Sequence, residues 1–422
     1  MAVTVDGVTD VAERRRLLTT RGLRALVDGT VATVLPAYLL ARGLTPTQVG
    51  AVVTATLLGS AAVTLTIGLR AGRVDRRQLL RIMSVLMVVT GLLFGTVTTF
   101  AALLVVAAIG TINPSGGDVS AFLPVEQALL PETAPAERRT HVFAMFSLVA
   151  SVCAAFGALL AGLPGWIADQ DWLSDLDALR GVFYAYAAVG ALLLVLYAGL
   201  RPRPPAAVGP RGGHALHRSK AIVYRMSALF SLDAFGSGFA GQAIIVLWLQ
   251  LRFGLSTATA GAVFFWAALL TASSALLAPR IAARIGLVRT MVYTHIPANL
   301  LLLLAAVAPT APLAIGFLLG RAFLSQLDVP ARTSYVMAVV DPDERTAAAT
   351  VTNVPRSLAS ALPPLAAGWM LDHSTYGWPL LAAGILKTTY DLLFLLLFRD
   401  VRPPEEQVVV PPEEGALGTG GR

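Results

Sequence analysis

Ionisable side chains lie inside several long apolar runs of this sequence, and their chemistry needs an explanation. A charged side chain at the centre of a bilayer costs about 2.5–3.5 kcal/mol on insertion scales, so each one is a candidate functional group. A buried carboxylate without a fixed cation holds a proton more readily than one in water and can exchange it near neutral pH. The candidates for proton coupling are Asp28, Asp118, Asp233 and Asp328. Asp28 and Asp233 lie roughly 10 Å from the nearer end of their runs, so they can instead reach toward water.

Other polar residues in these runs carry the donors and acceptors that bind a small solute. The candidates for a substrate cavity are Asn113, Glu126, Arg321, Gln326, Asn353, Arg356, Lys387 and Asp391. A structural explanation competes for some of them. Lys387 and Asp391 are four residues apart, on one helix face, and can neutralise each other. Arg321 and Asp328 are two helical turns apart and can form a similar pair.

Helix-breaking residues lie beside some of these candidates. The sequence Asn-Pro-Ser-Gly-Gly at 113–117 directly precedes Asp118, and Pro355 follows Asn353 by two residues. Broken helices in a membrane leave backbone amides and carbonyls free to face a cavity. We therefore expect the translocation site to lie beside these breaks.

The elements that must position these residues are membrane-spanning helices. Of the 422 residues, 56% are hydrophobic and 14% are charged, against about 25% charged in a soluble domain, and the mean hydropathy is +0.70. The runs lack the alternation of outer-membrane strands, so we expect an all-α membrane protein and not a barrel. Twelve spans are predicted, at residues 23–42, 46–69, 78–98, 101–130, 140–163, 180–200, 226–251, 257–278, 287–308, 311–339, 346–371 and 376–398.

The basic residues predict how these spans are oriented. Residues 1–22 are charged and lack a signal-peptide cleavage pattern, so we expect an uncleaved cytoplasmic segment. With that orientation, only three of the 32 Lys and Arg residues fall in outside loops: Arg42, Arg180 and Arg252. Cytoplasmic loops carry such an excess of positive charge. We therefore expect a multi-pass protein of the cell (plasma or inner) membrane with both ends in the cytoplasm, and no nucleic-acid partner.

A central segment divides the chain into two halves. Residues 201–225 are rich in Pro, Gly and Arg and are predicted to form a cytoplasmic linker. The linker separates six-helix bundles at 23–200 and 226–399, and a cytoplasmic tail follows at 400–422.

The two halves resemble each other. Matching residues are Gly50 and Gly261 at an offset of 211, Asp118 and Asp328 at 210, and Gly162 and Gly368 at 206. Six spans, an even number, separate the copies, so both copies run in the same direction across the membrane. The sequence thus predicts two pseudo-symmetric bundles related by an axis along the membrane normal.

The residues that other functions require are missing. Neither Lys220 nor Lys387 ends a Gly-Lys-Ser/Thr phosphate loop, which excludes an ATP-driven pump. His-Glu-x-x-His and Gly-x-Ser-x-Gly are absent, so we do not expect an enzyme. Cys153 has no second cysteine to pair with. His214 and His217 have no further metal ligand nearby, so we expect neither a metal nor a cofactor.

Local motifs resemble the major facilitator superfamily over essentially the whole chain. That family's signature after its second helix reads Gly-x-Leu-Ala-Asp-Arg-x-Gly-Arg-Arg, and residues 68–77 here read GLRAGRVDRR. The residues that fit are Gly68, Arg73, Arg76 and Arg77. The acidic residue of the signature comes three positions later, as Asp75, and the second half keeps Arg284 and Gly286.

Two further turns are similar to those that the family has after its fourth and tenth helices. Their residues include Glu132, Arg138, Glu344 and Arg345. The resemblance implies a gate in which Arg73 or Arg76 pairs with Glu132 and holds one access state closed. The alternative is that these arginines only anchor the loops in the anionic headgroup region.

The resemblance implies a secondary active transporter that moves a small organic solute by alternating access of two rocking bundles. An acidic residue in the first span is similar to drug/proton antiporters of the superfamily, so we expect proton-coupled efflux with Asp28 as the first candidate. The Gly-Pro signature of those antiporters is absent from the fifth span. Arg321, Arg356 and Lys387 would also suit proton-coupled uptake of an anionic or zwitterionic metabolite, and a non-transporting sensor is a third alternative. We expect the solute, protons and lipid as partners of a monomer.

Overall fold

The computed structural model describes most of the chain as helix. The described residues are 3–70, 75–115, 120–135, 138–201, 217, 219–275, 277, 280–281, 284, 287–325, 327, 332, 340 and 344–398. Within them there is no β-strand, so the prediction of an all-α protein is confirmed.

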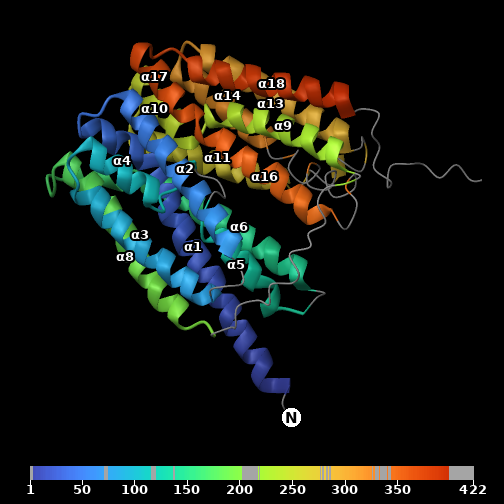
Figure 1. Ribbon diagram of the computed structural model, residues 1–422. Coiled ribbons are helices and arrows are strands. Elements are labelled where there is room, and N and C mark those ends of the chain that lie inside the picture. Colours follow the sequence, from blue (N-terminus) through green and yellow to red (C-terminus); the bar gives the residue numbers. More distant parts are fainter. Residues whose placement is uncertain are drawn as a thin grey trace, which may run out of the picture.

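The helices fall into two groups, one from each half of the chain (Figure 1). The first contains α1 (Val3–Ala41), α2 (Pro46–Arg70), α3 (Arg76–Thr96), α4 (Phe100–Ile109), α5 (Leu123–Leu129), the 3₁₀ turn η1 (Leu130–Thr133), α6 (Arg139–Leu160), α7 (Leu163–Asp169) and α8 (Asp175–Ala198). The second contains α9 (Lys220–Gly238), α10 (Gln242–Phe253), α11 (Thr257–Ala275), α13 (Leu287–Val307), α14 (Ala311–Leu324), α16 (Arg345–Ala361), α17 (Pro363–His373) and α18 (Trp378–Phe398).

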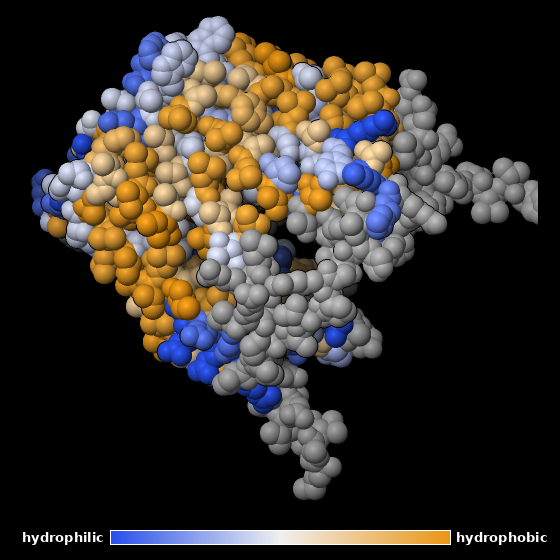
Figure 2. All heavy atoms as spheres, in the orientation of Figure 1, coloured by the Kyte–Doolittle hydropathy of each residue, from blue (hydrophilic) through white to orange (hydrophobic). Residues whose placement is uncertain are grey.

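Each of the twelve predicted spans coincides with one or two of these helices. Nine helical stretches in the described residues are long and apolar enough to cross a membrane, and α4 and α14 are shorter apolar helices. Large apolar side chains cover the flank of the molecule that is in view (Figure 2). The exposed large apolar residues of the chain include Val195, Trp369 and Leu396. Such a flank suits acyl chains and not water, and the protein is a multi-pass membrane protein.

The two groups pack in the same way. In the first, α1 packs on α6 and α8, α2 on α4, and α3 on α8. In the second, α9 packs on α16 and α18, α11 on α14, and α13 on α18. The corresponding turns also match, because Gly43 and Gly254, 211 residues apart, both have positive φ (79° and 65°). A residue with a β-carbon is strained in that conformation, which explains why glycine recurs there.

Three helix boundaries differ from the prediction. Helix α1 begins at Val3 and continues through the segment predicted to precede the first span. The predicted break around Pro355 is wrong, because α16 continues through it and the interruption falls at Leu362, before the Pro363-Pro364 pair. Neighbouring groups can satisfy the backbone that a membrane proline frees. The seventh span has an unpredicted break between α9 and α10.

The predicted break in the fourth span is present. Helix α4 ends at Ile109 and α5 begins at Leu123, with non-helical backbone in the described residues between them. Asn113 Oδ1 accepts hydrogen bonds from the backbone N and Oγ of Ser115, at 3.2 and 2.7 Å. In this local turn the Asn113 side chain hydrogen-bonds to the backbone and side chain of Ser115, which offers the backbone an alternative to a helix.

Candidate functional site

The two groups of helices touch through small residues that the repeat relates. A β-carbon built on Gly50 in α2 would lie 2.2 Å from the carbonyl oxygen of Pro364 in α17. A β-carbon on Gly261 in α11 would lie 2.2 Å from the carbonyl oxygen of Ala158 in α6. Real β-carbons are not found at that distance, so glycine is needed for both contacts.

Hydrogen bonds join the groups in the same region. Thr47 Oγ1 donates to Asp372 Oδ2 at 2.6 Å, and the Leu365 backbone N donates to Thr54 Oγ1 at 3.0 Å. Deeper in the molecule, Gln242 Nε2 donates to Thr33 Oγ1 at 2.9 Å. These contacts close the end of the molecule that carries the two glycine turns, which we name the loop face.

The opposite end, where α3 begins and α18 ends, is the terminal face. The hydrogen bonds between the groups that are described above lie at the loop face and deeper in the molecule. The described part of the structure is therefore closed at the loop face.

A buried ion pair lies inside the first group. Arg24 Nη2 in α1 is 2.7 Å from Glu126 Oε2 in α5, and the Tyr197 hydroxyl in α8 donates to Glu126 Oε1 at 2.6 Å. The guanidinium also lies 4.6 Å from the centroid of the Phe122 ring. Glu126, predicted to line the cavity, is fully buried in this pair. Arg24, at the start of the predicted first span, is itself buried in the core of the bundle.

Asp28 lies one helical turn from Arg24 on the same helix. Its side chain is buried, and no described group hydrogen-bonds to its Oδ1 atom. Arg24 and Arg21 are near enough to interact with it electrostatically. A buried carboxylate oxygen without a hydrogen bond is costly, and either a proton or a closer approach of Arg24 would relieve that cost.

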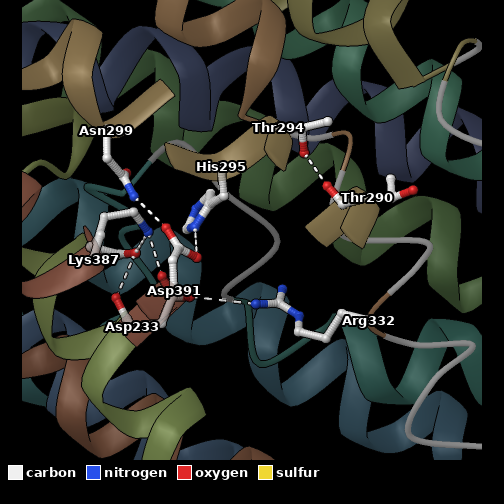
Figure 3. A network of polar contacts seen from close by, with 9 residues as sticks. Asp233, Thr290, Thr294, His295, Asn299, Arg332, Lys387 and Asp391 are labelled. Carbon is white, nitrogen blue, oxygen red and sulfur yellow. Dashed lines mark hydrogen bonds and ion pairs between the residues drawn. The ribbon is translucent and has the colours of Figure 1, made fainter. Parts of the chain in front are cut away.

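A larger network occupies the second group (Figure 3). Lys387 Nζ in α18 donates to Asp233 Oδ1 at 2.6 Å and to Ser237 Oγ at 2.8 Å, both in α9. Arg332 Nη1 is 3.4 Å from Asp233 Oδ2. The predicted pair of Lys387 with Asp391 is therefore wrong. Asp233 is fixed by two cations, so it does not reach toward water.

Asp391 instead contacts α13. His295 Nδ1 is 2.8 Å from Asp391 Oδ1, and Asn299 Nδ2 donates to Asp391 Oδ2 at 2.8 Å (Figure 3). The sequence interpretation missed His295 and Asn299, although they lie four residues apart in an apolar helix and thus share one face. Lys387 and Asp391 do share a face of α18, but they meet different neighbouring helices, which separates them.

The signs of the charges are exchanged between the two networks. In the first group the first span provides the cation, Arg24, and the fourth provides the anion, Glu126. In the second group the first span provides the anion, Asp233, and the predicted tenth span provides the cation, Arg332. Arg321 is also near enough to Asp233 to interact electrostatically.

The gating residues lie at the terminal face. Arg76 Nη1 is 2.6 Å from Glu132 Oε1 and donates to the Ala128 carbonyl at 3.2 Å, so this pair lies wholly within the first group. Asp75 caps α3 by accepting from the Arg77 backbone N at 3.2 Å. Glu344 accepts the backbone N–H groups of His217 and Ser219 where α9 begins. The other predicted gating residues that the structure describes do not join this pair. Arg77 donates to the Ala198 carbonyl, and Arg138 and Arg284 are exposed. Gly68 lies in α2, and Arg345 is the first residue of α16.

Several predicted residues lie outside the described part of the chain. They are Arg73, Asp118, Gly286, Gln326 and Asp328. Of the predicted cavity residues on α16, Asn353 is exposed and Arg356 is half-buried.

Comparison with known proteins agrees with this architecture. The chain matches the profile of the Major Facilitator Superfamily over residues 17–325 and 226–417. It is 25% identical over 414 residues to the uncharacterized membrane protein YJR124C of Saccharomyces cerevisiae, covering 90% of this chain and 92% of that one.

Solved transporter structures share the fold. A bacterial homologue of the human lysosomal transporter Spinster, inward-facing and unoccupied, has a TM-score of 0.70 at 15% identity, covering 93% of this chain and 97% of that one. The nucleoside transporter NupG has a TM-score of 0.71 at 14% identity, covering 92% and 99%. The xylose transporter XylE from E. coli, inward-open, has a TM-score of 0.71 at 15% identity, covering 93% and 96%.

Proposed function

Because the chain belongs to the major facilitator superfamily, we propose that this secondary transporter exports a small organic solute in exchange for protons. The observation that carries the proposal is the state of Asp28. The other buried carboxylates have partners: Glu126 pairs with Arg24, Asp233 with Lys387, and Asp391 with His295. Among the described carboxylates at mid-membrane, Asp28 alone has a buried oxygen without a hydrogen bond.

Proton binding at Asp28 would alter the balance of charge in the first group. When Asp28 is ionised, it competes with Glu126 for Arg24, one turn away. When it is protonated, it no longer attracts Arg24, which then interacts only with the network of Glu126 and Tyr197. Helix α1 packs against α10 and α11 of the other group, so a small movement of α1 affects the contact between the groups. This supports a link between proton binding and the access state.

The contacts between the groups suit alternating access. They pack small residues against backbone at the loop face, whereas the ion pair of Arg76 with Glu132 at the terminal face lies within one group. With both chain ends in the cytoplasm, as the arginine distribution predicts, this conformation is inward-open. Opening the loop face would separate the Gly50 and Gly261 contacts and present the same central region to the outside.

The sign of a solute-driven pH change tests the proposal. Proteoliposomes would contain the protein and a trapped pH-sensitive dye, with no initial pH gradient. A panel of solutes would be added outside, one at a time, with protein-free liposomes as the control. Exchange predicts that a transported solute makes the lumen more alkaline, because protons leave as it enters. Acidification would show symport instead, and solute entry without a pH change would contradict proton coupling.

Replacing Gly50 by alanine is expected to disfavour closure of the loop face. The new β-carbon would overlap the Pro364 carbonyl, and overpacking of this kind costs about 1–3 kcal/mol. About 1.4 kcal/mol changes an equilibrium tenfold, so the closed-to-open ratio at the loop face should fall about tenfold. A thiol introduced by Ser357→Cys, in a Cys153→Ser background, would then react more slowly with a reagent applied at the terminal face.

Gly316→Ala is the matched control, because nothing lies within 4 Å of its added β-carbon. It should leave the thiol reactivity at position 357 unchanged. Equal reactivity in the Gly50 and Gly316 variants would show that the tight contact does not govern the access state.

A further inference from the structure

Helix α16 carries a stripe of uncharged polar side chains. Asn353 and Ser357 are four residues apart and both are exposed, and Ser360 continues the stripe three residues later. A helix turns by about 100° per residue, so residues at these spacings lie on one face. An exposed asparagine on a membrane helix requires water or a polar partner, not lipid.

The stripe faces the other group of helices. Pro364 comes eleven residues after Asn353, about three turns, and the backbone at the junction stays helical, with φ −79° and ψ −41° at Leu362. Asn353, Ser357 and Pro364 therefore point in nearly the same direction. The Pro364 carbonyl touches Gly50 of the first group. Leu358 points about 140° away from Asn353 and is an exposed apolar residue that suits lipid.

Helix α6 carries the counterpart. At the offset of 206 that relates Gly162 to Gly368, Asn353 and Ser357 correspond to Ser147 and Ser151. Both serines are exposed. Ala158 comes seven residues after Ser151, about two turns, and its carbonyl touches Gly261 of the second group. Each stripe thus lies on the side of its helix that meets the other group, α6 toward α11 and α16 toward α2.

The cations of the two networks already have acidic partners. Arg24 is bound to Glu126, and Lys387 is bound to Asp233. Arg356, on the edge of the stripe, also interacts with another residue. Hydroxyl and amide groups are left to meet a solute, and they both donate and accept hydrogen bonds.

We propose that Ser147, Ser151, Asn353 and Ser357 form a binding site for an uncharged solute that carries several hydroxyl or amide groups. Such a solute replaces water on both stripes without leaving a buried charge unpaired. The inference rests on the proposed transport function and names the class of its substrate.

Protection of a cysteine tests this assignment. Ser357→Cys, in a Cys153→Ser background, is labelled with a membrane-impermeant maleimide in the presence of solutes that differ mainly in charge. The pairs are D-glucose and gluconate, uridine and uridine 5′-monophosphate, and glycerol and glycerol 3-phosphate. At least one neutral member is expected to slow labelling tenfold or more, while its charged partner has little effect.

Variants separate binding from a change of shape. Asn353→Ala and Ser147→Ala should each weaken the protection by a factor of about 5–10, as expected for loss of one hydrogen bond. Ser273→Ala is the matched control, because Ser273 is exposed on α11 but points about 120° away from Gly261. It should leave the protection unchanged.

Three outcomes overturn the inference: protection by the charged members only, protection by no neutral member, or protection that the stripe variants leave intact. Failure of proton coupling would look different. In that case a neutral solute would still protect the thiol introduced at position 357, but it would cause no pH change in the dye-loaded proteoliposomes.

Discussion

Asp28→Asn is expected to abolish the solute-driven pH change in dye-loaded proteoliposomes while leaving exchange of labelled solute for unlabelled solute intact. Asparagine has the same size and shape as aspartate, but its amide does not take up or release a proton near neutral pH. Solute exchange needs the two access states and the binding site, whereas the pH change also needs a group that carries a proton between them. The substitution therefore separates coupling from transport.

Asp177→Asn is the control for a carboxylate that is not at the site. Asp177 is exposed at the start of α8 and pairs with Arg180 at 2.8 Å. Its substitution should leave both readouts unchanged. An undiminished pH change in Asp28→Asn would remove Asp28 from the coupling mechanism, and loss of exchange as well would show a structural role instead.

The second large effect is expected from Lys387→Met, which should lower the free energy of unfolding by about 3–5 kcal/mol. The substitution removes the 2.6 Å contact with Asp233 and leaves Ser237 Oγ without that donor. Arg332, 3.4 Å from the other carboxylate oxygen, compensates only in part. Unfolding in detergent micelles, followed by fluorescence during denaturant titration, measures the loss.

The control uses the only other lysine of the chain, Lys220, which is exposed at the start of α9. Lys220→Met should change the free energy of unfolding by less than about 1 kcal/mol, as for most surface substitutions. Asp233→Asn combined with Lys387→Met should recover part of the loss, because the buried carboxylate that lost its lysine is then neutral, whereas Arg332 loses its contact with that carboxylate. Equal stability of Lys387→Met and Lys220→Met would contradict the buried pair.

The sequence predicted those features that depend on local pattern. The twelve spans follow from apolar runs, and the matched glycines follow from the repeat. Gly50, Gly261 and Gly368 prove to lie at the contacts between the groups. The break after Ile109 follows from the Asn-Pro-Ser-Gly-Gly sequence.

The sequence could not predict which polar groups meet across helices. The spacing of Lys387 and Asp391 places them on one face, but rotation and depth of the neighbouring helices decide that they contact Asp233 and His295 respectively. The pairing of Arg24 with Glu126 could not be predicted for a related reason, since helix α1 continues beyond the apolar run that marks the first span. Pro355 was predicted to break its helix because local propensity takes no account of the packing around α16, and α16 continues through this proline.

Alternating access is the central claim, and pairs of spin labels at the two faces test it most directly. One pair replaces the exposed Thr45 and His373 at the loop face, and the other replaces the exposed His141 and Lys220 at the terminal face, both in a Cys153→Ser background. Pulsed electron resonance in lipid nanodiscs then gives the distance distributions as the pH is varied. We predict two populations in each pair, with the loop-face distance lengthening where the terminal-face distance shortens. A single fixed distance in each pair, or two distances that lengthen together, would contradict the account.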